Sequence, residues 1–374
     1  MFATIAPLPK FRDLILAFLY SSLSDDNLAR PWSKQGEHNI WFSRSAWSLH
    51  AIAQWRARLN NNKNIIVWVP DFFCNISLLP LRDIGVKFIF YPIKNDLTPN
   101  MDWCISQNNQ IDPDLFILVH YFGEIKYVNN ISEFCKAKRA WLVEDAAHVL
   151  LPTLGIGTFG DFVIFSPHKH LALPDGAILI IRKNGPSELR ENEIKINFLN
   201  FIRFNSYTSK NRNLNLSIIW LIKRVIQKFG IRGNYTRVQL WPESIHSNYF
   251  LPSPMMSTLA KKLLSIQIRH LNKIAKLRIK NYLAWSRNIS LKYKNIGDYT
   301  LLPIKATPYL ACVSSNDFNI TKNLFNEFQI NNLPVITWPD LPPEVMAKPE
   351  NHFIAIKLRK SRIYLPVHQT LKII

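Results

Sequence analysis

Residues 141–177 read WLVEDAAHVLLPTLGIGTFGDFVIFSPHKHLALPDGA, and this stretch decides the fold. Two short apolar runs, at residues 140–143 and 162–165, are typical of buried parallel strands. Polar residues follow each run. Because the carboxyl ends of strands line the ligand crevice of an open α/β sheet, we expect these polar side chains to meet at one edge. They are Asp145, His148, Ser166 and Lys169.

An acid and a lysine in this arrangement suit pyridoxal phosphate. A lysine amine can form a Schiff base with the cofactor aldehyde, and an acid can keep the pyridine nitrogen protonated so that the ring accepts electrons. Partial burial and a cationic neighbourhood would lower the pKa of Lys169. The alternative is structural: Lys169 would be a surface residue after a core strand, and Asp145 would cap a helix.

Three segments of this stretch resemble the DegT/DnrJ/EryC1/StrS aminotransferases, which have the fold-type I architecture of pyridoxal phosphate enzymes. Residues 143–148 are similar to the Glu-Asp-Ala-Ala-Gln/His segment of that family, and residues 157–161 to its Gly-Thr-x-Gly-Asp. Residues 169–171 followed by 174–176 are similar to its Lys-Asn-Leu…Gly-Glu-Gly.

The resemblance implies a role for each polar residue. Lys169 would be the Schiff-base lysine, Asp145 would pair with the pyridine nitrogen, His148 would lie near the ring or its phenolic oxygen, and Ser166 would reach the phosphate. The chain departs from the family in two places. The usual Ser-Phe-His-x-Thr-Lys is shortened to residues 166–169, and His170 replaces the usual Asn.

An earlier segment resembles the phosphate-binding Ser-Gly-Thr-Ala-Ala-Leu of the family. Ser45 stands at the Thr position, Ala46 follows, and Arg44 replaces the Gly. A hydroxyl and free amides at the start of a helix form a natural phosphate site. Spacing alone would equally allow a simple helix cap.

Two further cofactor contacts follow from the resemblance. An aromatic residue after Pro70 stacks on the cofactor ring in the family; we name Phe73, although an ungapped count reaches Cys74. Asn248 resembles the first residue of the family's Asn-Tyr-Arg motif, which reaches the phosphate of a neighbouring subunit. Phe250 stands where the motif has Arg.

Alternating strand and helix patterns predict an α/β protein with a large, mostly parallel sheet and a smaller C-terminal α/β domain. We place the N-terminal arm and large cofactor domain at residues 1–250, with a basic insertion at about 195–240. The long helix and small domain occupy residues 251–374. Predicted helices cover 11–22, 48–59, 132–138, 216–229, about 254–285 and 318–328; predicted strands cover 65–69, 87–93, 115–120, 177–182, 309–313 and 333–337.

The composition narrows the possible classes of partner and cellular location. The formal net charge is +20, but the basic residues are spread through the chain and no nucleic-acid motif accompanies them, so we expect no nucleic-acid partner. Four scattered cysteines and no long apolar run indicate a cytoplasmic protein without a transmembrane helix. No metal site is expected. The basic amphipathic helix at 216–229 could cover its own protein, a partner or a membrane surface.

The family chiefly transfers an amino group from glutamate or glutamine to a nucleotide-linked keto sugar, for polysaccharides or secondary metabolites. The resemblance therefore implies an aminotransferase with small-molecule donor and acceptor, acting as a homodimer. Two rivals stay open: a different pyridoxal phosphate reaction, such as dehydration or chemistry on a non-sugar substrate, and a non-enzymatic binding protein with the same fold.

Overall fold

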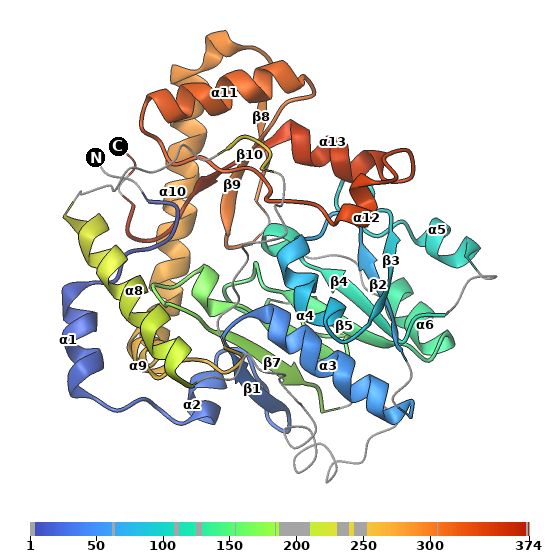
Figure 1. The fold of residues 1–374 in the computed structure, drawn as a ribbon. Coiled ribbons are helices and arrows are strands. Elements are labelled where there is room, and N and C mark those ends of the chain that lie inside the picture. Colours follow the sequence, from blue (N-terminus) through green and yellow to red (C-terminus); the bar gives the residue numbers. More distant parts are fainter. Residues whose placement is uncertain are drawn as a thin grey trace.

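The computed structural model describes most of the chain, including the whole stretch that carries the predicted lysine apart from Leu154. The described residues are 4–61, 64–107, 112–124, 129–153, 155–183, 185–186, 210–229, 239–242, 253–304, 306–371 and 373. Figure 1 shows a large sheet with helices packed around it and a second, smaller sheet formed by the end of the chain.

The large sheet has seven strands in the order β1-β7-β6-β5-β4-β2-β3. Their bounds are β1 His38–Phe42, β2 Ile66–Pro70, β3 Lys87–Tyr91, β4 Leu115–Val119, β5 Trp141–Ala146, β6 Phe162–Phe165 and β7 Ala177–Ile181. The five strands from β3 to β6 pair in parallel, whereas β7 and β1 are antiparallel to their neighbours. The predicted fold class, a mostly parallel α/β sheet, is confirmed.

Apolar side chains on both faces explain why these strands read as continuous hydrophobic runs. Successive side chains of a strand point to opposite faces. Accordingly, Ile178 and Ile180 of β7 belong to one core cluster, and Leu179 and Ile181 belong to the other. Helices therefore cover both faces of the sheet.

The helices are bounded as follows: α1 Phe11–Leu19, α2 Asp25–Ala29, α3 Ser45–Leu59, α4 Leu79–Arg82, α5 Met101–Ser106, α6 Asn129–Ala137, α8 Lys210–Lys228, α9 Thr258–Gln267, α10 Leu271–Lys292, α11 Phe318–Ile330, α12 Pro343–Met346 and α13 Phe353–Ser361. Side chains of α3, α4 and α6 line one core cluster, and those of α1, α2 and α9 line the other. Within the described ranges, none of the helices combines the length and apolar character needed to cross a bilayer.

The small sheet has the order β10-β9-β8 and is antiparallel. Its strands are β8 Thr300–Leu301, β9 Leu310–Ser314 and β10 Arg362–Pro366. The long helix α10 links the two parts, because Leu271 and Ile274 pack in the core of the large sheet while Trp285 and Ile289 pack beside the small sheet. The division at residue 250 stays a prediction.

Several elements differ from the sequence prediction. The sequence patterns did not predict β1, an edge strand held by its ladder with β7. The long helix expected at about 254–285 is two helices joined by the 3₁₀ turn Ile268–His270, and the second continues to Lys292. The strand expected at 333–337 is wrong: Ile336 forms only an isolated bridge with Tyr364. Local patterns do not specify such tertiary pairing.

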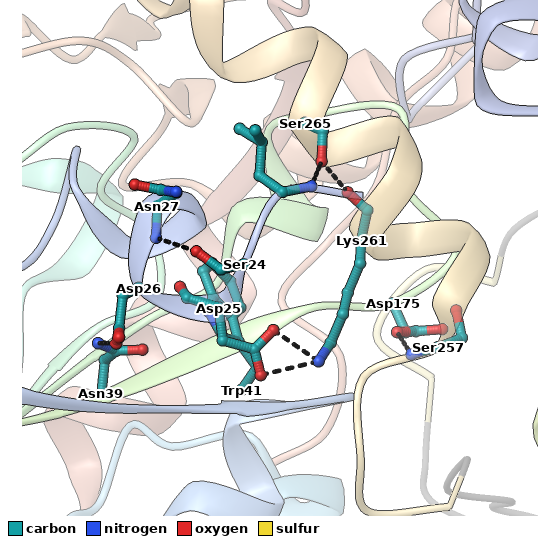
Figure 2. Close-up of polar contacts among 11 residues, drawn as sticks. Ser24, Asp25, Asp26, Asn27, Asn39, Trp41, Asp175, Ser257, Lys261 and Ser265 are labelled. Atoms are coloured by element: carbon teal, nitrogen blue, oxygen red, sulfur yellow. Dashed lines mark hydrogen bonds and ion pairs between the residues drawn. The ribbon is translucent and has the colours of Figure 1, made fainter. Parts of the chain in front are cut away.

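Helix α9 is fastened to the N-terminal segment by polar contacts (Figure 2). The Nζ of Lys261 lies 2.7 and 2.9 Å from the two carboxylate oxygens of Asp25. The Oγ of Ser265 accepts a 2.9 Å hydrogen bond from the amide of Leu23 and donates one of 2.8 Å to the carbonyl of Lys261. The amide of Ser257 donates to Asp175, so the same helix start supports the loop that follows the predicted lysine.

Candidate active site

Lys169 ends a short 3₁₀ turn, Pro167–Lys169, directly after β6. Its ammonium nitrogen lies 5.9 Å from the ring centroid of Tyr309. Burial lowers the pKa of Lys169; Asp145 and Cys74 oppose this effect, and the nearby positive charge of Arg44 adds to it. The net direction favours the neutral amine, which is the nucleophilic form.

Asp145 lies in β5, the strand that pairs with β6. Its side chain is buried, and Oδ1 accepts a 2.9 Å hydrogen bond from the amide of Ala147. Burial raises the pKa of Asp145, and the positive charge of Lys169 counteracts that rise. The structure therefore brings the predicted acid and lysine together at the carboxyl ends of two neighbouring strands.

His148 stands between two aromatic rings. Its ring stacks on Tyr309 at a centroid distance of 4.6 Å and on Phe122 at 5.5 Å. Nδ1 lies 3.3 Å from the amide of Phe122, so this nitrogen is an acceptor for the backbone N–H. Burial, followed by the charge of Lys169, lowers the pKa of His148 well below its ordinary value. His148 is accordingly neutral and held at a fixed angle beside the lysine.

A group of hydroxyls and backbone amides provides a place for an anion. Ser45 and Ala46 are the first residues of α3, where amides have no partner within the helix. The Oγ atoms of Ser43 and Ser166 are buried and have no hydrogen-bond partner among the described residues. A buried hydroxyl without a partner is costly, so a ligand that accepts hydrogen bonds would stabilise each of these two hydroxyls that it reaches.

Arg44 adds positive charge to this region. Its guanidinium donates to the carbonyl oxygens of Ser43 and Pro174, at 3.0 and 3.1 Å. Burial lowers the pKa of Arg44, and the carboxylate of Asp175 opposes the effect. The structure places Arg44 where its charge interacts with Lys169 and His168.

His168 closes the loop around the lysine. Its Nδ1 lies 2.8 Å from the carbonyl of Gly176, and its own amide donates to the same oxygen. Gly176 has φ +135°, a conformation that side chains disfavour, and a Cβ there would lie 2.9 Å from Met256. The shortened loop is therefore compact, with His168 used for its closure.

The glycine-rich segment near residues 157–160 is bound to a neighbouring carboxylate. Glu144 accepts hydrogen bonds from the amides of Gly157, Phe159 and Gly160 and lies 2.8 Å from Nε2 of His120. Although burial alone raises the pKa of Glu144, the hydrogen bond and charge of His120 and the two amide bonds leave it below the ordinary value. These hydrogen bonds thus fix the conformation of the chain around β5.

The two candidates for the ring-stacking position, Phe73 and Cys74, have different surroundings. Phe73 is buried in the hydrophobic core that includes Phe72. Cys74 interacts electrostatically with Lys169, and burial raises its pKa to about 11. The structure therefore places Cys74 where its charge can interact with that of Lys169, and Phe73 as the ring-stacking residue stays a prediction. Asn248 lies outside the described residues.

Three residues near the lysine were not predicted as site residues. Tyr309 stacks on His148, and its pKa rises to about 12 because of burial. His170 is fully buried, with neither ring nitrogen hydrogen-bonded in the described part of the chain. Asp340 is buried beside Cys74, and its carboxylate oxygens accept no hydrogen bond from described residues. Tyr309 and Asp340 come from the distant C-terminal part, where no local motif marks them.

The residues present fit pyridoxal phosphate. The unpartnered hydroxyl of Ser166 and the start of α3 suit the phosphate. The buried Asp145 suits a protonated ring nitrogen, and Lys169 with its lowered pKa suits attachment of the aldehyde. Among the described residues, no group of three His, Cys, Asp or Glu side chains could hold a metal ion.

Comparison with known families agrees with this geometry. The family model of the DegT/DnrJ/EryC1/StrS aminotransferases matches residues 109–197. That segment contains the four strands β4 to β7 together with Asp145, Glu144 and Lys169. The resemblance predicted from the motifs is thereby confirmed over the part of the chain that carries them.

Solved structures share the fold over the whole chain. Helicobacter pylori PseC, an aminotransferase involved in the biosynthesis of pseudoaminic acid, is 14% identical with a TM-score of 0.65; the match covers 99% of this chain and 95% of PseC. Spr1654 from Streptococcus pneumoniae, described as a sugar aminotransferase and solved in its PLP form, is 12% identical with a TM-score of 0.68, over 100% and 95% of the two chains.

A third structure, the aminotransferase TlmJ from Streptoalloteichus hindustanus, is 14% identical with a TM-score of 0.65, over 100% of this chain and 94% of TlmJ. At such identities the likeness concerns the fold. The DegT/DnrJ/EryC1/StrS aminotransferase model therefore matches the segment that carries the motifs, and the solved aminotransferases share the fold of the chain.

Proposed function

We propose that this protein transfers an amino group from glutamate or a similar donor to a keto sugar carried on a nucleotide. The observation that carries the proposal is the placement of Asp145 and Lys169 at the carboxyl ends of two neighbouring strands, where their charges interact and burial lowers the pKa of the lysine. The matched family and the sugar aminotransferases with the same fold support the class of reaction. The sugar acceptor rests on the family resemblance.

Pyridoxal phosphate, when bound, supplies an electron sink for the carbanion that forms at the substrate carbon. The protein holds and moves the protons. Nζ of Lys169 in its neutral form would take the proton from the substrate α-carbon and return it, as a general acid and base. Asp145 would accept a hydrogen bond from the N–H of the protonated ring nitrogen and stabilise its positive charge.

The other residues would bind the cofactor and hold it in position. Ser166, Ser43 and the first amides of α3 would bind the phosphate, and Arg44 would balance its charge. His148, fixed by Tyr309 and Phe122, presents a neutral ring beside Lys169. These groups are set by packing before a ligand arrives, which lowers the ordering cost of binding.

Asp340 is the residue we assign to the acceptor. A sugar offers several hydroxyl donors, and an unpartnered carboxylate is a strong acceptor for them. Replacing Asp340 with Asn should raise the KM for a keto-sugar acceptor while leaving the half-reaction with the amino donor unchanged. If the donor half-reaction is lost to the same extent, Asp340 does not act on the acceptor.

The first experiment is the visible absorption spectrum of the purified protein with added pyridoxal phosphate, before and after borohydride, with peptide mapping of the reduced adduct. The proposal expects a visible band that disappears on reduction, with the label on Lys169. Addition of glutamate to the unreduced protein should then release 2-oxoglutarate, detected by mass spectrometry. A labelled Lys169 without 2-oxoglutarate would favour another pyridoxal phosphate reaction.

The loop before the lysine supports amino transfer over dehydration. In the sugar dehydratases related to this family, His stands where aminotransferases have Lys. Here His168 is engaged with the carbonyl of Gly176, whereas Lys169 is placed against Asp145. A dehydratase would release water from its sugar without consuming glutamate, so the donor test above separates the two reactions.

The proposal includes a homodimer, as the family resemblance implies, and a cytoplasmic location. The four cysteines, Cys74, Cys104, Cys135 and Cys312, are all free, which suits a reducing compartment. Light scattering after size-exclusion chromatography would measure the oligomeric state. A monomer that is fully active would contradict the shared-site arrangement that the resemblance implies.

A further inference from the structure

Helix α1 has two apolar faces. Leu14 and Ala17 are buried against the core that includes α9. Phe11, Ile15 and Phe18, spaced at i, i+4 and i+7, lie on another side and are exposed, as is Leu19. The buried face accounts for the helix packing on the protein. The exposed face has no such explanation.

Helix α8 repeats this arrangement. Trp220, Leu221 and Val225 pack against the same core. Its other side exposes Ile218, Ile222 and Ile226 at successive turns, with Ile219 beside them and Phe229 just after the helix. The sequence predicted an amphipathic helix here, and the structure shows that packing on the protein uses only part of its apolar surface.

Helices α1 and α8 lie side by side at one edge of the molecule (Figure 1). The rings of Phe11 and Phe229 are 6.1 Å apart. Nζ of Lys228 lies 3.6 Å from the centroid of the Phe11 ring and donates to the carbonyl of Pro9. We call this surface the apolar ridge; its members are Phe11, Ile15, Phe18, Leu19, Ile218, Ile219, Ile222, Ile226 and Phe229, each 40–71% exposed.

The ridge is bordered by positive charge. Residues 10–20 and 216–229 contain five basic residues, Lys10, Arg12, Lys223, Arg224 and Lys228, and one acidic residue, Asp13. Large contiguous apolar surfaces mark interaction sites. A helix surface that combines exposed Phe and Ile with Lys and Arg is typical of one that lies in a membrane interface.

We propose that the apolar ridge docks the protein on the surface of an anionic lipid bilayer. The positive charge at the border of the ridge indicates which partner binds there. A second copy of this chain in a two-fold contact would bring like charges together, whereas anionic headgroups complement the basic border. The proposed attachment is peripheral, with the ridge lying in the headgroup region. The ridge is formed by α1 and α8, so its test is independent of the amino-transfer reaction.

The test is flotation of the full-length protein with vesicles of phosphatidylcholine alone or of phosphatidylcholine mixed equally with phosphatidylglycerol. Binding to the mixed vesicles only is expected. It should fall as salt rises to about 1 M, where the screening length is ~3 Å. The double variant Phe18→Ser/Ile222→Ser should weaken binding by about tenfold for each side chain, given the free energy of burying one.

Matched controls separate the ridge from a general surface effect. Leu291→Ser/Ile330→Ser removes two exposed apolar side chains from α10 and α11 and should bind normally. Lys10→Glu/Lys223→Glu should lose binding, whereas Lys322→Glu/Lys348→Glu, with the same change in net charge, should lose much less. Equal loss in both charge variants would overturn the ridge as the site.

Two other outcomes would also overturn the proposal. One is the absence of binding to the anionic vesicles. The second is a dimer that Phe18→Ser/Ile222→Ser converts to a monomer without any vesicle binding, which would assign the ridge to a second copy. Light scattering and circular dichroism of each variant verify its assembly and folding.

Discussion

Nε2 of His120 lies 2.8 Å from a carboxylate oxygen of Glu144, and both side chains are fully buried. The same carboxylate accepts three backbone amides from residues 157–160. These contacts connect the strand that carries Asp145 to the loop before β6. The two acidic residues of the motif therefore have different roles. Glu144 stabilises the conformation of the surrounding chain, and Asp145 interacts with the lysine.

Replacing Glu144 with Ala should destabilise the protein by about 3–5 kcal/mol, because it leaves buried donors without an acceptor. Urea unfolding followed by circular dichroism measures the effect. Exposed Glu350→Ala is the control and should change little. Because the folded pKa of Glu144 is lowered, its contribution is complete above the unfolded pKa, about 4.3, and is lost as the pH falls through the folded value. An unchanged midpoint in Glu144→Ala would contradict this assignment.

Ser166→Ala should leave the cofactor-free protein as stable as before or slightly more stable, since its Oγ has no partner among the described residues. Affinity for pyridoxal phosphate should fall about 10- to 100-fold, the loss expected for a hydrogen bond to a charged group. Fluorescence titration gives the Kd, and thermal unfolding gives the stability.

Ser265→Ala is the matched control for that variant, because its Oγ makes two hydrogen bonds in α9 and toward Leu23 (Figure 2). It should lower the stability by about 1–2 kcal/mol and leave the Kd unchanged. A Ser166→Ala protein that binds the cofactor normally would remove Ser166 from the phosphate site.

Cys74→Ala should shift the absorption maximum of the bound cofactor, whereas Phe73→Leu should lower the stability with the spectrum unchanged. The reason is that Cys74 interacts electrostatically with Lys169, whereas Phe73 belongs to a hydrophobic core cluster. Large-to-small changes in a packed core cost about 2–5 kcal/mol when most of the side chain is removed, and less for Phe→Leu. The opposite pattern would restore Phe73 as the residue on the ring.

Local sequence patterns were sufficient to predict the strands that carry Asp145 and precede Lys169. The buried strands around Asp145 and Lys169 follow directly from apolar runs that end in polar residues. Tyr309 and Asp340 could not be predicted, because the small sheet and its loops bring them to the lysine from about 140 to 170 residues away in the chain. The choice between Phe73 and Cys74 stays a prediction, because the count of residues after Pro70 does not decide between them.

Two substitutions should move the titration of Lys169 in opposite directions. The carboxylate of Asp145 raises the pKa of this lysine, and the guanidinium of Arg44 lowers it. Asp145→Asn should therefore shift the pH profile of amine reactivity to lower pH, and Arg44→Met should shift it to higher pH. The readout is modification of Lys169 by trinitrobenzenesulfonate in the cofactor-free protein, mapped by mass spectrometry. Arg287→Met, at an exposed position on α10, controls for net charge. Profiles that shift in the same direction would show that burial, rather than these two charges, sets the reactivity of the lysine.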